Sequence, residues 1–331
     1  MEILAYGVQA DEKPLLERAF AGRHSLRTLP VFLNRDTAPL AADYPAVSSS
    51  VNAVLDAETL TLLATGGTEL ITQRSTGFNN IDLDAAADLG LTIARVSHYS
   101  PYAVAEHAWA LALAVNRRLT RAANRSREFD FRLDGLLGRD VHGMTVGVIG
   151  TGKIGECFTR IAAGFGTELL GWDIAENPVC RGLGMQYTEL PELLSRADLI
   201  SLHVPLVPAT HHLIDSAALA RMKSDAILVN SSRGGLVDST ALVETLRHGR
   251  LSGVGLDVYE EETGVFFTDR SIQGITDDIL ARLLTFPQVL VTGHQAYFTR
   301  TAVGQIIDAT VRNVDDFAAG RTSENTLLPR D

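Results

Sequence analysis

The spacing of glycines within residues 145–173 is the feature that most restricts how this chain can fold. Gly150, Gly152 and Gly155 form the pattern G-x-G-x-x-G, which directly follows the apolar run 145–149 and opens a helical pattern. Glycine permits the tight turn from strand to helix and the close packing of that helix on the strand. The stretch therefore predicts a strand–turn–helix unit of a parallel α/β sheet.

The same turn predicts a ligand. N–H groups at the start of the helix and the positive end of its dipole would face the phosphates of a dinucleotide. The next strand ends at Asp173, which lies 173 − 155 = 18 residues after Gly155, near the spacing of a carboxylate that binds ribose hydroxyls. A glycine-rich turn with an unrelated surface Asp is the alternative, but strand, turn, helix and acid agree. We expect NAD, because Asp173 would repel a 2′-phosphate and residues 174–176 supply no Arg to offset this.

Composition bounds the class of protein. A length of 331 residues accommodates two domains, and the formal charge of −11 argues against a surface for nucleic acid or an anionic membrane. Cys157 and Cys180, the two cysteines, give neither a disulfide framework nor a C-x-x-C metal pattern. Because of this cysteine usage we expect no metal. We see no signal peptide and no run of 18 apolar residues, so we expect the protein to be cytoplasmic.

Strand-like and helical patterns alternate in two parts of the chain, which is typical of parallel sheets covered by helices. The first part ends near residue 99. A long helix is predicted from Pro101 to about residue 127, followed by a loop at 129–144 and a second α/β series. A terminal helix at 299–319 lacks a sheet of its own, so we expect it to pack on the first domain. We predict two doubly wound domains, 1–99 with 299–331 and 100–298, with ligand sites in a cleft between them.

Three side chains are candidates for chemistry. Arg233 follows the apolar run 226–230 and could hold a ligand carboxylate with a bidentate fork, although a surface Arg in a turn is the commoner case. His294 follows another apolar run and could exchange a proton near neutral pH, or could simply pack at a domain junction. Glu262 could stabilise a charged imidazole, but its acidic surroundings alone favour a solvated loop.

Other histidines have less specific interpretations. His203 ends a predicted strand and could line the cofactor pocket or be structural. His211 and His212 are adjacent, and we interpret them as an exposed pair and not as a metal site.

With these residues in view, the chain resembles the D-isomer-specific 2-hydroxyacid dehydrogenases, and among them the bacterial fermentative D-lactate dehydrogenases. The resemblance covers essentially the whole chain and reverses the interpretation of Glu262. It is carried by the segments 74–80 (Arg-Ser-Thr-Gly-Phe-Asn-Asn), 99–107 (Tyr-Ser-Pro-Tyr-Ala-Val-Ala-Glu-His), 147–155, 230–238 (Asn-Ser-Ser-Arg-Gly-Gly-Leu-Val-Asp), 256–262 (Leu-Asp-Val-Tyr-Glu-Glu-Glu) and 292–296 (Thr-Gly-His-Gln-Ala).

The resemblance implies a Rossmann nucleotide-binding domain and a flavodoxin-like catalytic domain. It implies that Arg233 binds the substrate carboxylate, that His294 is the acid/base, and that Glu262 stabilises its protonated form. Predicted substrate contacts are Thr76, Gly77, Tyr99, Tyr297 and Arg233. Predicted cofactor contacts are Gly150, Gly152, Lys153, Ile154, Gly155, Asp173, His203, Val204, Pro205, Ser231, Ser232 and Asp257, the last near the nicotinamide carboxamide.

Two departures from the family pattern affect the pocket wall. Ser97-His98 stands where many members have a Pro and a small residue, and Thr76 stands where Ala or Val is frequent. We expect NAD-dependent, reversible reduction of pyruvate to D-lactate by a homodimer or higher oligomer. A bulkier 2-keto acid such as phenylpyruvate or a branched-chain acid is one alternative substrate, and an NADH-sensing regulatory protein is a less favoured alternative function.

Overall fold

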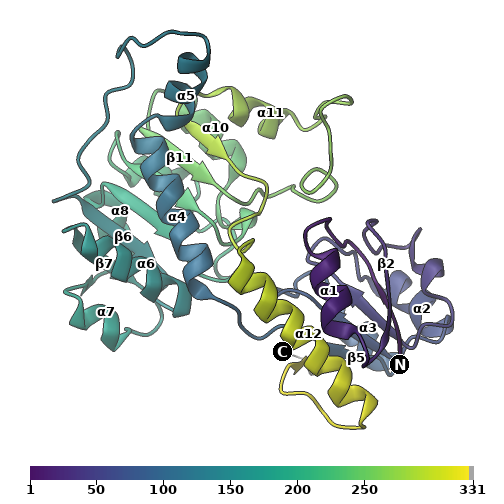
Figure 1. Cartoon of the computed structure of the whole chain (residues 1–331). Coiled ribbons are helices and arrows are strands. Elements are labelled where there is room, and N and C mark those ends of the chain that lie inside the picture. Colours follow the sequence, from purple (N-terminus) through teal and green to yellow (C-terminus); the bar gives the residue numbers. More distant parts are fainter. Residues whose placement is uncertain (328–331) are drawn as a thin grey trace. The chain divides into compact units, whose positions relative to one another are not determined.

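The computed structural model describes residues 1–327 and folds them as two compact units (Figure 1). One unit combines Met1–Ser100 with the segment that begins at Phe298, and the other is Pro101–Tyr297.

The N-terminal unit contains a sheet in the order β13-β5-β4-β3-β1-β2, parallel except for β13, which runs antiparallel to β5. Its strands are β1 (Glu2–Ala5), β2 (Ser25–Thr28), β3 (Ala46–Ser49), β4 (Leu70–Gln73), β5 (Thr92–Ala94) and β13 (Thr326–Leu327). Its helices are α1 (Lys13–Phe20), α2 (Ala57–Thr65), α3 (Leu83–Asp88), α12 (Arg300–Ala318) and a 3₁₀ turn, η1 (Ala38–Ala41).

Helix α12 belongs to the core of this unit although it comes from the other end of the chain. It packs beside α1, as the yellow and purple helices in Figure 1 show, and it also contacts β4. Its buried positions Val303, Ile307 and Val311 share one apolar cluster with Ile3 and Leu16. The spacing of four residues between these α12 positions forms a single apolar stripe, which explains why this helix needs a sheet to cover it.

The second unit contains a parallel sheet in the order β12-β11-β10-β9-β6-β7-β8. Its strands are β6 (Thr145–Ile149), β7 (Glu168–Trp172), β8 (Gln186–Tyr187), β9 (Leu199–Leu202), β10 (Ile227–Asn230), β11 (Gly253–Leu256) and β12 (Val289–Val291). Its helices are α4 (Pro101–Asn116), α5 (Leu119–Arg127), α6 (Lys153–Gly164), α7 (Pro178–Gly182), α8 (Leu190–Arg196), α9 (Ser216–Arg221), α10 (Ser239–Arg247), α11 (Asp278–Thr285) and the 3₁₀ turn η2 (Gly234–Leu236).

This second sheet is buried on both faces. Ile227 and Val229 of β10 join the apolar cluster formed with α4 and α6, whereas Leu228 between them joins the cluster formed with α9 and α10. Alternate residues of a strand point to opposite faces, so the unbroken apolar run of β10 fits a strand that is covered on both sides.

The long helix predicted from Pro101 to about residue 127 is wrong in one respect, because it is two helices. The break falls at Arg118, whose φ of 53° is left-handed and cannot continue an α-helix. The Arg118 guanidinium donates to the carbonyls of Val115 and Ser252, which holds the chain in this bent form. A helical sequence pattern does not report such a tertiary contact.

Candidate active site

The three candidate catalytic side chains lie on loops that follow three neighbouring strands. Arg233 follows β10, Glu262 comes after β11, and His294 follows β12. The strands are parallel, so their carboxyl ends meet at one edge of the sheet. Backbone hydrogen bonds continue the pairing beyond the strands, from Asp257 N to Asn230 O (2.9 Å) and from His294 N to Asp257 O (2.7 Å).

His294 and Glu262 form a direct pair. Nδ1 of His294 lies 2.7 Å from Oε1 of Glu262, and the side chains are 13% and 18% exposed. The other carboxylate oxygen of Glu262 accepts the N–H of Tyr259 at 3.1 Å. Because Nδ1 is occupied by the carboxylate, Nε2 is the nitrogen left to exchange a proton with a ligand. The acidic segment is therefore not simply a solvated loop.

A buried carboxylate shapes the turn that carries His294. Asp257 is fully buried, and it accepts hydrogen bonds from the N–H groups of Gln295 (2.9 Å) and Ala296 (2.8 Å) and from Oγ1 of Thr292 (2.5 Å). His294 itself has a φ of 55°, a left-handed conformation that is uncommon for residues other than glycine. Asp257 thus holds a strained turn in place, while its predicted contact with the nicotinamide carboxamide stays a prediction.

His107 of α4 completes this network. Its Nε2 lies 3.0 Å from Oγ1 of Thr292 and 3.3 Å from Oδ1 of Asp257. His107 is the last residue of the family segment 99–107, and the sequence predicts no role for it. No local signal could have found this contact, because His107 and Thr292 are 185 residues apart.

The loop of Arg233 is pressed against the loop of Glu262. A Cβ placed on Gly234 would lie 2.1 Å from the carbonyl carbon of Tyr259, so a side chain at this position would force the two backbones apart. Asn230 shapes the Arg233 loop by donating to the Arg233 carbonyl (2.8 Å) and accepting the N–H of Ser232 (3.0 Å). Arg233 forms no ion pair within residues 1–327, so its charge is available to a ligand.

The glycine turn has the close packing that its pattern predicts. A Cβ on Gly155 would lie 1.9 Å from the carbonyl oxygen of Gly150, and Gly150 has a φ of 93°. By contrast, a Cβ on Gly152 would meet nothing within 4 Å. Gly152 caps α6, whose first residues are Lys153 and Ile154, so this open space lies at a helix N-terminus and fits a phosphate.

Asp173 lies beside this turn. Its Oδ2 accepts the N–H of Thr151 (2.5 Å), and its Oδ1 accepts the N–H of Ile174 (2.7 Å). The carboxylate therefore ends the second strand next to the middle of the glycine pattern, where the ribose of a dinucleotide bound at the helix N-terminus would lie.

The remaining predicted cofactor residues come from the next strands of the same sheet. His203, Val204 and Pro205 follow β9, and Ser231 and Ser232 follow β10. Oγ of Ser232 donates to the carbonyl of Val204, whereas the buried Oγ of Ser231 lacks a partner within the described chain. Burial lowers the pKa of the His203 imidazole to about 3, so His203 is neutral at physiological pH.

Thr76, Gly77 and Tyr99 belong to the N-terminal unit. Thr76 and Gly77 lie half-buried on the loop after β4, where Arg95 donates to the Thr76 carbonyl (2.8 Å) and Ser75 donates to the Gly77 carbonyl (2.7 Å). In the part of the chain that the structure describes, their own N–H groups donate no hydrogen bond. Their role with substrate, like that of Tyr99 and the half-buried Tyr297, stays a prediction.

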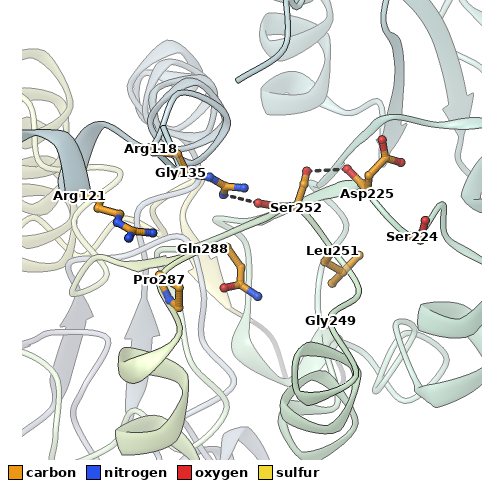
Figure 2. Close-up of a pocket in the computed structure, with 10 residues that line it drawn as sticks. All are labelled: Arg118, Arg121, Gly135, Ser224, Asp225, Gly249, Leu251, Ser252, Pro287 and Gln288. Atoms are coloured by element: carbon orange, nitrogen blue, oxygen red, sulfur yellow. Dashed lines mark hydrogen bonds between the residues drawn. The ribbon is translucent and has the colours of Figure 1, made fainter. Parts of the chain in front are cut away.

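A cavity of about 350 Å³ lies at the opposite edge of the second sheet (Figure 2). Its lining comes from segments that precede β10, β11 and β12, such as Ser224, Leu251 and Gln288, and from Arg118 and Arg121. Because Arg233, Glu262 and His294 follow these strands, the cavity is separate from the candidate active site.

Comparison with known proteins gives the class of this site. The sequence model of the family described as "D-isomer specific 2-hydroxyacid dehydrogenase, NAD binding domain" matches residues 109–296. The chain belongs to this family. Among the described residues, no helix is long and apolar enough to cross a membrane.

Relatives within the family match along the whole chain. The chain is 44% identical to 2-hydroxyacid dehydrogenase homolog 1 of Schizosaccharomyces pombe (99% of each chain) and 41% identical to D-lactate dehydrogenase of Escherichia coli (99% of this chain, 100% of the relative). It is 36% identical to an aromatic 2-oxoacid reductase of Clostridium sporogenes (98% of each). The D-lactate dehydrogenase of Aquifex aeolicus, solved with NAD and lactic acid, superposes with a TM-score of 0.88 at 31% identity, covering 99% of this chain and 100% of the other.

These findings confirm the α/β fold with two parallel-sheet domains and the expectation of an NAD-dependent oxidoreductase. The open space at Gly152, and the hydroxyl of Ser231 that has no hydrogen-bond partner within residues 1–327, are local features that fit the dinucleotide.

Proposed function

We propose that this protein is an NAD-dependent D-lactate dehydrogenase that interconverts pyruvate and D-lactate. The observation that carries the proposal is the pair formed by His294 and Glu262 at the carboxyl edge of the NAD-binding sheet, beside a loop whose Arg233 lacks an acidic partner within residues 1–327. Reduction of a 2-keto acid requires a guanidinium that binds the carboxylate of the acid and an imidazole that gives a proton to its carbonyl oxygen.

The roles follow from the chemistry of each group. Arg233 binds the substrate carboxylate and polarises the neighbouring carbonyl. Bound NADH supplies the hydride that reduces the keto carbon. Nε2 of protonated His294 gives its proton to the carbonyl oxygen, so that pyruvate, NADH and one proton yield D-lactate and NAD⁺. Glu262 stabilises the imidazolium before this transfer, and the reverse reaction begins with neutral His294.

The loop around Thr76 and Gly77 supports recognition of a carboxylate. Their N–H groups donate no hydrogen bond within residues 1–327, and consecutive free N–H groups suit an anion. We propose that they bind the substrate carboxylate, and that Tyr99 and Tyr297 line the pocket around the group attached to the keto carbon.

The rival substrate class is a bulkier 2-keto acid, and the relative named as an aromatic 2-oxoacid reductase makes it a real alternative. Two tyrosines should narrow the pocket, so we expect pyruvate to exceed phenylpyruvate and branched-chain 2-keto acids in kcat/KM. Steady-state turnover of NADH with a panel of these acids is the test. A strong preference for phenylpyruvate would transfer the proposal to that class, and no turnover with any 2-keto acid would favour a regulatory NADH-binding protein.

We further propose a preference for NADH over NADPH. Asp173 would repel a 2′-phosphate, and a charge clash of about 1.4 kcal/mol corresponds to a tenfold preference. Asp173→Asn removes the charge and should reduce that preference when kcat/KM is measured with both cofactors. Equal efficiency of the unmodified protein with NADH and NADPH would contradict this assignment.

We propose that the protein acts in the cytoplasm as a homodimer or higher homo-oligomer formed through the NAD-binding unit. The segment after α5 exposes large apolar side chains at Phe129, Phe131, Leu133 and Leu137. Several exposed large apolar side chains within one short segment are typical of an interface between subunits. Light scattering of the purified protein should therefore give at least twice the 35.7 kDa mass of one chain, and a monomer at micromolar concentration would contradict the proposal.

A further inference from the structure

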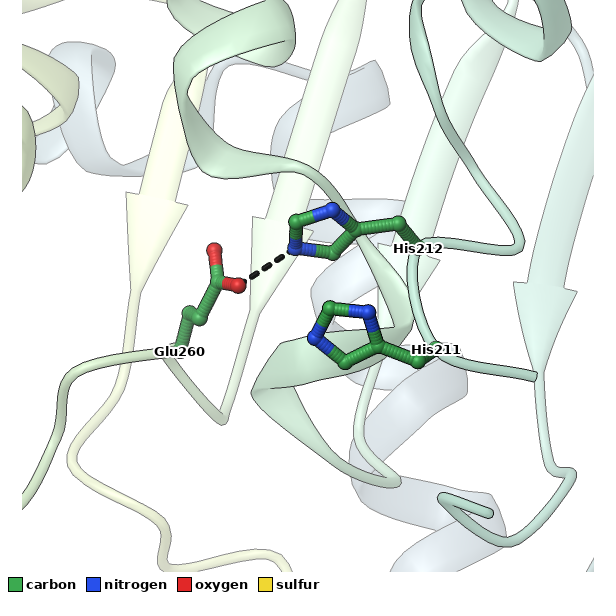
Figure 3. Close-up of side chains that lie close together, drawn as sticks. All are labelled: His211, His212 and Glu260. Atoms are coloured by element: carbon green, nitrogen blue, oxygen red, sulfur yellow. Dashed lines mark hydrogen bonds and ion pairs between the residues drawn. The ribbon is translucent and has the colours of Figure 1, made fainter. Parts of the chain in front are cut away.

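A second cluster of potential ligands lies outside the candidate active site. His211 and His212 belong to the loop between β9 and α9, and Glu260 belongs to the loop after β11. One ligand atom from each of the three residues lies within 4.8 Å of the others. Figure 3 shows the two imidazole rings stacked, with the Glu260 carboxylate against the edge of the His212 ring.

The backbone explains why two adjacent histidines face the same way. His212 has a left-handed φ of 51°, and the ring centroids of His211 and His212 lie 4.0 Å apart at an interplanar angle of 22°. The expectation of an exposed pair is correct for His211 but wrong for His212, which is partly buried against Glu260. Nε2 of His212 lies 2.5 Å from Oε1 of Glu260, a contact that sequence spacing could not predict.

Both loops are anchored independently of any ligand. The N–H of His212 donates to the carbonyl of Gly235 (2.8 Å), and the N–H of His211 donates to the carbonyl of Val207 (3.0 Å). The Glu260 loop is fixed by the close approach of Tyr259 and Glu260 to Gly234. Potential ligands on fixed backbone lose little conformational freedom when an ion binds, which favours binding.

We propose that His211, His212 and Glu260 form a site for a divalent transition-metal ion, with Zn²⁺ as the preferred occupant. Two imidazoles and one carboxylate are a donor set that suits Zn²⁺ and not Mg²⁺ or Ca²⁺, which prefer oxygen ligands. Ligands about 2.1 Å from a tetrahedral ion are roughly 3.4 Å apart, so small side-chain rotations close the site. The ion would lie between Nε2 of His212 and the Glu260 carboxylate in place of their direct contact, and water would take the fourth position.

The site has a structural consequence. Zn²⁺ would connect the loop after β9 to the loop after β11, and both loops contact the Gly234–Gly235 segment that follows Arg233. Binding to the folded state alone should therefore stabilise the NAD-binding unit. The inference does not depend on which 2-keto acid the enzyme reduces.

The test is Zn²⁺ binding to the full-length, tag-free protein after removal of metals with a chelator. Calorimetry should detect one Zn²⁺ per chain with a dissociation constant in the micromolar range or below, and saturating Zn²⁺ should raise the unfolding temperature. His211→Ala and Glu260→Gln should each weaken binding at least tenfold and abolish the thermal shift. Mg²⁺ and Ca²⁺ should produce neither effect.

His248→Ala is the matched control, because His248 is an exposed histidine at the end of α10 that has no part in the cluster. It should bind Zn²⁺ as the unmodified protein does. Undetectable binding at millimolar Zn²⁺, or binding that His211→Ala and Glu260→Gln leave unchanged, would overturn the proposal. Because His211 is exposed, His211→Ala should fold and keep basal turnover in metal-free buffer, so a loss of binding can be separated from misfolding.

Discussion

Each of the two units holds a loop at the carboxyl edge of its sheet with one buried charged residue, and the two residues have opposite charge. In the NAD-binding unit, Asp257 accepts N–H groups from the turn of His294. In the N-terminal unit, Arg74 donates to the carbonyls of Tyr6 (2.7 Å) and Ser48 (3.2 Å), at the ends of β1 and β3. Both side chains are almost completely buried.

The difference in sign decides what each loop leaves available to a ligand. Asp257 accepts hydrogen bonds from the N–H groups of Gln295 and Ala296, so these groups cannot bind a ligand. The side chain of His294 is the group of this turn that can react with a substrate. Arg74 satisfies strand-end carbonyls and leaves the N–H groups of Thr76 and Gly77 without a hydrogen bond in the described chain. One unit is thereby suited to supply a proton donor, and the other is suited to supply backbone donors for an anion.

The largest effect should come from removing the side chain that the first loop presents. We expect His294→Ala to lower turnover in both directions by roughly 10²–10⁴-fold, the usual contribution of a positioned acid/base. Stopped-flow and steady-state rates measure the effect, and NADH binding followed by fluorescence is the control for folding. A loss below tenfold would mean that the imidazole is not the proton donor.

The next largest effect should separate the two buried charges. Asp257→Asn places an amide donor against N–H groups, displaces the turn of His294 and should lower kcat by about 10–100-fold with a smaller change in KM. Arg74→Met removes the guanidinium donor from the Tyr6 carbonyl, whereas the Ser48 carbonyl keeps the N–H of Tyr6, so the variant should raise KM for pyruvate and lower the free energy of unfolding by about 1–3 kcal/mol.

Steady-state kinetics and urea unfolding of both variants measure these quantities. Equal effects of the two variants on kcat, with KM unchanged in each, would remove the proposed contrast between the units.

A smaller effect should show whether Glu262 acts on His294 through its negative charge or only by holding the imidazole in position. Glu262→Gln keeps a hydrogen-bond partner beside Nδ1 of His294 but removes the charge that stabilises the imidazolium. We expect the alkaline limb of pyruvate reduction to shift to lower pH, with lactate oxidation losing less activity near neutral pH. The pH profiles in both directions measure this, and an unshifted alkaline limb would show that the charge of Glu262 does not act on His294.

The smallest effect concerns the pH dependence of stability and arises from His203, a buried and neutral imidazole that follows β9 in the NAD-binding unit. The pKa of His203 is lowered to about 3 by burial, against about 6.5 in an unfolded chain, so the unfolded state binds the proton more readily. Stability should thus decline as pH falls from 6.5 toward 3, with a slope of at most about 1.4 kcal/mol per pH unit from this residue.

His203→Gln should flatten that slope, as measured by urea unfolding between pH 7 and pH 5. An identical pH dependence in the variant and the unmodified protein would show that the folded protein protonates His203 as readily as the unfolded chain does. Burial of His203 would then make no contribution to the pH dependence of stability.

Much of this edge could be predicted from sequence because its signals are local. The pattern of Gly150, Gly152 and Gly155 and the following Asp173 reflect rules of turn geometry and spacing that act within 25 residues. The loops of Arg233 and His294 follow apolar runs, and parallel strands bring such loops to one edge. Pairing Glu262 with His294 required the family resemblance, since composition alone favoured a solvated loop.

What could not be predicted depends on contacts between distant segments. The end of α4 at Arg118 is set by a carbonyl of Ser252, which lies 134 residues away. The network of His107, Thr292 and Asp257 joins α4 to two strand ends, and the pair of His212 and Glu260 spans 48 residues. Each contact depends on which strands become neighbours, and residue periodicity carries no information about that order.

The place of α12 in the N-terminal unit has a consequence for biosynthesis. The core around Ile3 and Leu16 is completed by Val303, Ile307 and Val311, which leave the ribosome only after the whole of Pro101–Tyr297. At 5–20 residues per second, translating those roughly 200 residues takes about 10–40 s. The nascent first hundred residues must spend that interval with the apolar surface that packs against α12 uncovered. The unit whose synthesis begins first is therefore the unit whose folding finishes last.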